Sequence, residues 1–214
     1  SEGNYTYYMQ CQDRAGNIMD LNDEVVHRLR HDSIHPTTTN NYTNNDTWVS
    51  GDALIELSST DASPSSGIIW TRYCLGAGCT PNNNYVAPIA LGEGDHILRY
   101  RARDSAGNDE PIKELLVKID QTSPITSHNY TLNDTWTPDP QTIELTSNDP
   151  LPSSGLNWTR YCIGTGCNPE TGTDYSSPLN FNHGEYVLRF QSNDNVNNYE
   201  EINELVIRID ENTP

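Results

Sequence analysis

The sequence predicts an all-β chain of tandem antiparallel β-sandwiches in an extended array. The stretch WTRYCLGAGCTP at residues 70–81 returns 88 positions later as WTRYCIGTGCNP at residues 158–169. Turn residues recur roughly every 8 to 12 positions, and apolar residues alternate with polar ones without a helical period. A fixed period of this length is typical of repeat architectures, so the 214 residues are expected to form repeats rather than one large domain.

The period sets the expected domain boundaries. Two full repeats are predicted at residues 37–124 and 125–214, each ending in an Asp-x-x-x-Pro link whose proline stops the last strand. Residues 1–36 align with the last two strands of the other repeats and end in the same link. Because two strands cannot bury a core, we expect upstream strands of a longer polypeptide, or strands of a neighbouring chain, to complete this segment.

The strand after each glycine turn shows the clearest alternation. Its expected inward positions in the three copies are Tyr5, Tyr7, Met9 and Cys11; His96, Leu98, Tyr100 and Ala102; and Tyr186, Leu188, Phe190 and Ser192. A period of two marks a half-buried strand. Cys11 is therefore predicted to be a buried thiol, because Ala102 and Ser192 hold the same position in the other copies.

Shorter elements complete each full repeat. They are a polar opening arm (41–48 and 129–136), a short strand (54–57 and 142–145), a Ser/Pro/Asp loop (61–67 and 149–155) and an Asp-rich turn (104–108 and 194–198). The turn separates the last two strands, since Asp accepts hydrogen bonds from backbone N–H groups two residues on and Gly or Asn adopts the left-handed region.

The paired cysteines are predicted to form local disulfides, Cys74 with Cys79 and Cys162 with Cys167. A six-residue ring at a hairpin tip needs residues with positive φ, and each ring contains Gly-x-Gly. Half of a zinc site is the alternative, but no further Cys or His stands at ligand spacing. A redox-active pair is the other alternative, and it usually lies closer together at a helix start.

Charge and cysteine content bound the partners and the compartment. The net charge is −18, from 30 acidic and 12 basic side chains, so nucleic acids and anionic membranes are excluded as partners. The expected partners are neighbouring repeats of the same or an identical chain, and surface glycans. Disulfides favour an extracellular or cell-surface location. The sequence has no run of 18 apolar residues for a membrane span and no leader at Ser1, so a mature or excised chain is expected.

Two kinds of surface site are considered. The candidates for N-glycosylation are the six Asn-x-Thr sequons at Asn4, Asn41, Asn45, Asn129, Asn133 and Asn157. Calcium is a hypothesis motivated by acidic residues near the repeat ends: Asp104, Asp109, Glu110, Asp120 and their counterparts. The competing interpretation is turn capping and a solvated acidic face, and no Asp-x-Asp-x-Asp-Gly loop is present. The sequence thus predicts no cofactor and assigns no metal ligands.

Several of these residues carry a resemblance. They are Arg72-Tyr73, the Gly-rich tip, Pro81, Tyr85, Pro88-Ile89, Gly94, Leu98 and residues 104–108. Their pattern, which covers about 85% of the chain, resembles the immunoglobulin-like repeats of prokaryotic cell-surface proteins, and most closely the C-terminal module of chitobiase and β-hexosaminidase. The resemblance implies an immunoglobulin-like fold and says less about function. The chain departs from that pattern in having a disulfide ring where the family has an acidic hairpin tip.

The favoured function is structural: a non-enzymatic spacer in an extracellular stalk, adhesin or filament, stiffened by disulfides and proline links. One alternative is a carbohydrate- or protein-binding module that uses Trp70 and Trp158 as exposed platforms. The competing interpretation places these tryptophans in the core, whereas the resemblance favours Tyr73 and Tyr161 as the core residues of the strand. Another alternative is an accessory region of a secreted hydrolase. No catalytic motif is present, and the spacing of His27, His31 and His35 lies in a strand-to-linker segment where a helical period means little.

Overall fold

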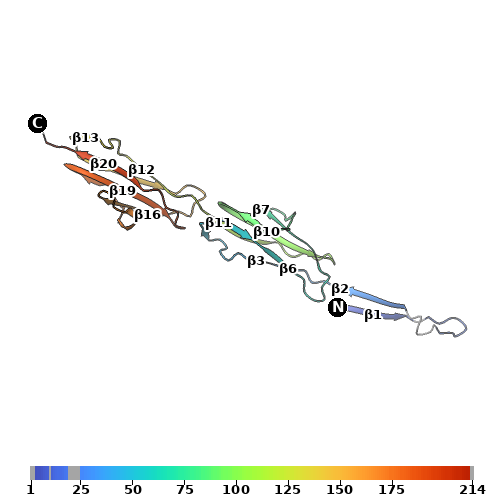
Figure 1. Cartoon of the computed structure of the whole chain (residues 1–214). Coiled ribbons are helices and arrows are strands. Elements are labelled where there is room, and N and C mark those ends of the chain that lie inside the picture. The colour runs from blue at the N-terminus through green and yellow to red at the C-terminus, as the bar shows by residue number, and fades with distance from the viewer. Residues whose placement is uncertain (1–2, 10, 19–24, 213–214) are drawn as a thin grey trace. The chain divides into compact units, whose positions relative to one another are not determined.

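The computed structural model describes residues 3–9, 11–18 and 25–212 (Figure 1). This part of the chain is all β, with mainly antiparallel pairing, and its one helical element is the 3-10 turn η2 (Pro169–Thr171). None of its helical segments has the length and apolar character that crossing a membrane requires. The predicted fold class, an antiparallel β-sandwich, is confirmed.

The first two strands, β1 (Gly3–Met9) and β2 (Val25–His31), pair antiparallel with Gly3 opposite His31 and Met9 opposite Val25. The prediction that one face of β1 is buried is wrong for the described chain. Tyr7 is 51% exposed, Met9 is 50% exposed and Cys11 is an exposed thiol. The reason is that no second sheet covers this pair among the described residues, so alternation in β1 has nothing to pack against.

The first full repeat contains nine strands. They are β3 (Thr37–Asn40), β4 (Trp48–Val49), β5 (Ala53–Ile55), β6 (Leu57–Thr60), β7 (Ile68–Leu75), β8 (Asn83–Asn84), β9 (Ile89–Leu91), β10 (Gly94–Asp104) and β11 (Lys113–Ile119). One sheet has the order β4-β11-β10-β7-β8, and the smaller sheets are β3-β6 and β5-β9. Strands β7 and β10 are antiparallel, with Tyr73 opposite Tyr100.

The second full repeat has the same elements in the same order. They are β12 (Ile125–His128), β13 (Trp136–Thr137), β14 (Gln141–Ile143), β15 (Leu145–Asn148), β16 (Leu156–Ile163), β17 (Thr173–Asp174), β18 (Leu179–Phe181), β19 (Gly184–Asp194) and β20 (Asn203–Ile209). The large sheet is β13-β20-β19-β16-β17, with β12-β15 and β14-β18 as the smaller sheets. The turn η2 lies between β16 and β17 and has no counterpart in the first repeat.

The core of the second repeat follows the predicted alternation. Leu188 and Phe190 of β19 are 0% and 1% exposed, and Ser192 is 0% exposed. The rest of this buried cluster is Tyr130, Ile143, Leu145, Phe181, Leu205, Ile207 and Ile209, with Tyr161, Tyr175, Leu179 and Tyr186 packed at its edge. In β10 of the first repeat, Leu98, Tyr100 and Ala102 are likewise buried.

A glutamate joins the first strand of each repeat to its large sheet, and it is buried in the first repeat and partly buried in the second. Glu110 is 2% exposed and accepts hydrogen bonds from Thr38 N (2.7 Å), Thr38 Oγ1 (2.6 Å) and Ala102 N (3.0 Å). Lys113 adds an ion pair at 2.8 Å. In the second repeat Glu200 accepts from Thr126 N, Thr126 Oγ1 and Ser192 N in the same way, and Asn203 replaces the lysine. We call this arrangement the glutamate clamp.

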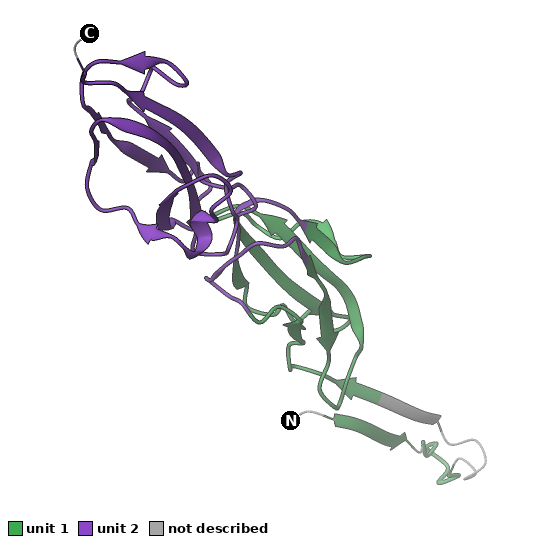
Figure 2. Cartoon of the chain, turned by 60° about the vertical axis from the view of Figure 1, so that its left-hand side comes forward, with its two compact units in different colours: residues 1–43, 54–90, 96–116 green, residues 44–53, 91–95, 117–214 purple. Residues whose placement is uncertain are grey.

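The chain divides into two compact units (Figure 2). Unit 1 comprises Ser1–Thr43, Leu54–Ala90 and His96–Leu116, and unit 2 comprises Asn44–Ala53, Leu91–Asp95 and Val117–Pro214. Each site described below lies within one unit. The boundaries expected from the 88-residue period remain a prediction, because this division cuts through the first full repeat.

Candidate functional site

Each cysteine pair forms a disulfide, Cys74 with Cys79 and Cys162 with Cys167, and the Cα atoms are 6.2 Å apart in both. The rings close the connections from β7 to β8 and from β16 to η2 and β17. In the first ring Gly76 and Gly78 have φ of 119° and 68°, values that a residue with a Cβ adopts only under strain. The glycines are therefore needed for the conformation of the ring.

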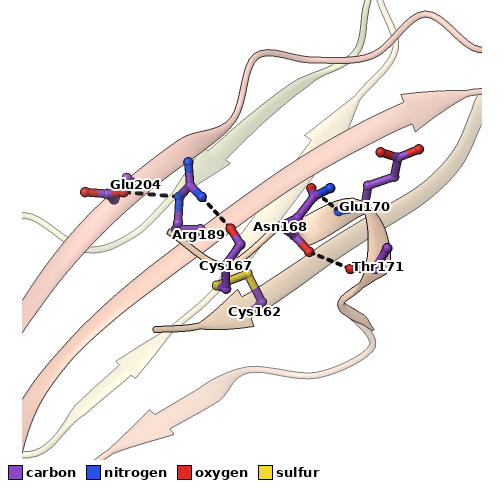
Figure 3. The surroundings of a disulfide bond; sticks show 7 residues. All are labelled: Cys162, Cys167, Asn168, Glu170, Thr171, Arg189 and Glu204. Carbon is purple, nitrogen blue, oxygen red and sulfur yellow. Dashed lines mark hydrogen bonds and ion pairs between the residues drawn. A yellow bond between two sulfur atoms is a disulfide. The ribbon is translucent and has the colours of Figure 1, made fainter. Parts of the chain in front are cut away.

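An arginine on the neighbouring strand holds each ring, which the sequence did not predict. Figure 3 shows Arg189 of β19 donating to the carbonyl oxygen of Cys167 while its Nε lies 3.1 Å from Glu204. Arg99 makes the same contacts with Cys79 and Glu114. Arg99 and Arg189 lie opposite Cys74 and Cys162 in the paired strands. The sequence holds a signal for this contact, because an arginine recurs at the same position of both repeats. This arrangement is structural and offers no reactive thiolate.

Removing the second ring should destabilise the chain moderately. For the variant Cys162→Ala/Cys167→Ala we expect a loss of about 2 kcal/mol of unfolding free energy, because a short ring removes little entropy from the unfolded chain. Urea unfolding followed by tryptophan fluorescence measures this loss. The control Cys11→Ala alters an exposed thiol and should stay within about 0.5 kcal/mol of the parent. An equal effect of both variants would contradict the structural role of the ring.

Three aspartates converge in the second repeat and form what we call the second cage. Asp120 follows β11, Asp149 opens the loop before β16, and Asp194 ends β19. One oxygen from each lies within 4.8 Å of the others. Asp120 and Asp194 are both 0% exposed, so two carboxylates of this group are fully withdrawn from water.

Backbone amides orient the second cage. Ser154 N donates to Asp120 Oδ2 at 2.6 Å, and Gly155 N donates to Asp149 Oδ2 at 2.9 Å. The turn predicted at residues 194–198 supplies two further donors to Asp194, Val196 N (2.9 Å) and Asn198 N (2.8 Å). The Asn198 side chain also donates to Asp120 O at 2.9 Å, which holds the turn against the segment that follows β11.

The first cage repeats this geometry with Asp32, Asp61 and Asp104. The matching donors are Ser66 N to Asp32 Oδ2 (2.8 Å), Gly67 N to Asp61 Oδ2 (2.8 Å) and Asn108 N to Asp104 Oδ1 (2.8 Å). Hydrogen bonding to Ser66 lowers the pKa of Asp32. An open polar cavity of about 600 Å³ borders this cage, and Arg30 and His31 also line it.

The calcium hypothesis from the sequence selected only part of these cages. Asp104 and Asp120 belong to them, one in each. Asp109 instead pairs with Arg103 at 2.7 Å, an interaction that lowers its pKa, and Glu110 forms the glutamate clamp. Their counterparts Asp194 and Asp32 complete two of the three positions in each cage. The hypothesis does not include the third position, Asp61 and Asp149 of the Ser/Pro/Asp loop, although these two aspartates recur at the 88-residue period.

The two tryptophans of the repeated stretch lie half-buried beside arginine side chains. Trp70 has Arg72 at 4.5 Å, Arg101 at 5.6 Å and Arg103 at 5.7 Å from its ring centroid. Trp158 has Arg160 at 4.6 Å and an edge contact with Tyr199. Tyr161 packs at the core of the second repeat. In the second repeat, therefore, Tyr161 and not Trp158 is the residue of this strand that packs against the core cluster.

All six sequon asparagines are exposed. Asn41 and Asn129 also bind the neighbouring strand: each donates to a backbone carbonyl (Leu54 or Thr142, 3.1 Å) and accepts from a backbone amide (Glu56 or Glu144, 2.9 Å). Of the three histidines noted in the linker, His31 is exposed, His35 Nδ1 contacts Pro36 O, and the side chain of His27 lies outside the described residues.

The strand order and the two layers of each full repeat define an immunoglobulin-like or fibronectin-III-like β-sandwich. Among solved structures, the chain is similar to the fibronectin(III)-like modules of CbhA from Clostridium thermocellum. That match has 16% sequence identity and a TM-score of 0.34, and it covers 81% of this chain and 94% of the other. No family model and no curated protein matches the sequence. The fold assignment therefore rests on the strand order of this chain.

Proposed function

We propose that the chain is a structural segment of an extracellular repeat protein, such as a stalk, an adhesin or a filament. The observation that carries this proposal is the repetition of the stabilising devices. The disulfide ring with its arginine, the glutamate clamp and the aspartate cage all occur twice with matching partners. A dedicated binding site usually diverges in one copy, whereas a spacer needs the same stabilisation in each.

The boundaries 37–124 and 125–214, and a relationship to the chitobiase-type immunoglobulin-like module, belong to the same proposal. Disulfides are compatible with an oxidising compartment outside the cytosol. The exposed sequons make the opening arms the expected glycan-bearing surface. Peptide mapping of native material by mass spectrometry tests this, and unmodified asparagine at all six sites would refute glycosylation.

Electron microscopy of the native material tests the structural role. We expect fibres or stalks with an axial repeat near two domain lengths. Discrete particles that carry a catalytic domain in the same polypeptide would instead favour an accessory region of an enzyme, and would overturn the proposal.

A carbohydrate- or protein-binding role is the second candidate, and one difference between the repeats favours it. Trp70 has three guanidinium groups around its ring, whereas Trp158 has one guanidinium and a tyrosine. A glycan array probed with the whole chain tests this candidate. Tight binding that is lost in Trp70→Ala and kept in Trp158→Ala would support it over the spacer role.

A further inference from the structure

We propose that the second cage binds one Ca²⁺ ion and that the first cage binds another more weakly. The proposal concerns the carboxylates themselves and does not depend on the spacer role. It starts from an electrostatic problem: three aspartates place oxygens within 4.8 Å of one another, and Asp120 and Asp194 are 0% exposed. Bringing buried like charges this close is unfavourable unless a cation or protonation relieves it.

Hydrogen bonds from the surrounding chain hold the carboxylates of the second cage in place. Asp194 accepts from Val196 N, Asn198 N and Asn198 Nδ2, and both oxygens of Asp120 accept from backbone amides (Thr122 and Ser154). None of the ion pairs found among the described residues involves an aspartate of either cage. A bound cation would supply the compensating charge.

A second observation points to a ligand. Asp149 Oδ1 is buried and has no hydrogen-bond partner, whereas Oδ2 of the same residue accepts from Ser153 Oγ and Gly155 N. Asp61 Oδ1 is in the same state in the first cage. Ser154 Oγ, next to the amide that orients Asp120, is also buried without a partner. Most buried polar atoms have a partner, and a cation in the second cage would give one to Asp149 Oδ1.

The donor set fits calcium. Carboxylate oxygens are hard ligands, and Ca²⁺ binds them at about 2.3–2.6 Å, so two ligands on opposite sides of the ion lie about 5 Å apart. Oxygens within 4.8 Å of one another can therefore all contact one Ca²⁺. Mg²⁺ requires shorter bonds and keeps most of its water, which makes three partly or fully buried carboxylates a poorer site for it.

The two cages should differ in affinity. Asp32 and Asp61 of the first cage are only partly buried, and the cavity beside Asp32 also contains Arg30 and His31. Nearby positive charge and water both weaken the attraction for a cation. In the second cage an ion would fix the segment after β11 to the loop before β16 and the turn after β19, all within unit 2.

Isothermal titration of the whole chain with CaCl₂, after removal of divalent ions with EDTA, tests the proposal. We expect two sites per chain, the tighter one in the range of about 10⁻⁴–10⁻³ M that extracellular modules show. Asp149→Asn should abolish the tighter site and leave one, and Asp61→Asn should abolish the weaker site. The double variant should bind none. The matched control is Asp174→Asn, since Asp174 is 71% exposed and pairs with Arg160; it should keep both sites.

Near-ultraviolet circular dichroism checks that each variant is folded. We expect Asp149→Asn to fold, because the asparagine side chain keeps an oxygen that accepts from Ser153 Oγ and Gly155 N. Equilibrium dialysis with ⁴⁵Ca²⁺ detects binding whose enthalpy is too small for calorimetry. The proposal is overturned if folded Asp149→Asn binds calcium like the parent, if the parent binds none at 10 mM (an order of magnitude above the expected range), or if MgCl₂ binds as tightly as CaCl₂. The two proposals are tested independently. A chain that binds no calcium would not contradict the spacer role, and discrete particles in micrographs would not contradict calcium binding.

Discussion

Glu110→Ala should lower the unfolding free energy by about 3–5 kcal/mol, a loss typical of breaking a buried charged network. The carboxylate accepts four hydrogen bonds or ion-pair contacts: from both donors of Thr38, from Ala102 N and from Lys113. Alanine would remove the acceptor of two buried backbone N–H groups, those of Thr38 and Ala102, and each orphaned group costs about 1–3 kcal/mol. The Thr38 hydroxyl would keep its hydrogen bond with Ser59 Oγ. Urea unfolding measures the loss. Glu56→Ala, which changes an exposed glutamate of the same repeat, is the control and should have little effect.

The pH dependence of the same residue gives an independent readout. Burial acts to raise the pKa of Glu110, but hydrogen bonds from Lys113, Thr38 and Ala102 outweigh it and lower the pKa below its ordinary value of 4.5. A lowered pKa in the folded state stabilises the fold at pH values above 4.5, and this contribution is lost as the pH falls through the folded-state value. The difference in unfolding free energy between the parent and Glu110→Gln should therefore decrease as the pH is lowered below 4.5. A gap that stays constant down to pH 2 would contradict a charged Glu110.

The glutamate clamp was hidden from the sequence because it joins positions 72 residues apart. Glu110 follows an Asp-rich turn, so it was grouped with acidic residues near the repeat ends as a calcium candidate. Local patterns predict strands and turns from neighbouring residues, and they do so well here, as the alternation of β10 shows. In β19 the alternation of burial ends at Phe190, since Gln191 and Asn193 are buried as well. Whether an acidic side chain is buried depends on the sheet that packs against its strand. The sequence of one strand alone does not contain this information.

The same limit explains the cages. Asp104 and Asp120 both lie near the end of the first full repeat, yet the fold places them in different cages. The partners of Asp104 come from the preceding link and the Ser/Pro/Asp loop (Asp32 and Asp61). Those of Asp120 come from the loop and the Asp-rich turn of the second repeat (Asp149 and Asp194). Comparison of the two repeats held the missing information, because Asp32 and Asp61 return as Asp120 and Asp149 at the same period as the cysteines. The prediction of a buried Cys11 is wrong because alternation along a strand predicts a buried face whether or not a second layer covers it. Among the described residues no second sheet covers β1 and β2.

Phe190→Ala should also cost about 3–5 kcal/mol, because a large aromatic side chain leaves a cavity that a packed sandwich fills only in part. Phe190 is 1% exposed, lies in the core cluster of unit 2 and makes an edge contact with His128 at 6.0 Å. Its counterpart Tyr100 offers a milder change in the first repeat. Tyr100→Phe removes only the hydrogen bond from Asn40 Nδ2 (2.9 Å), a loss of about 1 kcal/mol.

Thermal and urea unfolding of both variants compare the two effects. Leu151→Ala is the surface control, since Leu151 is 89% exposed and its truncation should change stability by less than about 0.5 kcal/mol. If Phe190→Ala were as mild as Leu151→Ala, β19 would not carry the core of the second repeat. The same strand ends at Asp194, which pairs with Leu156 of β16 and is fully buried, so the second cage belongs to the packing that this comparison tests.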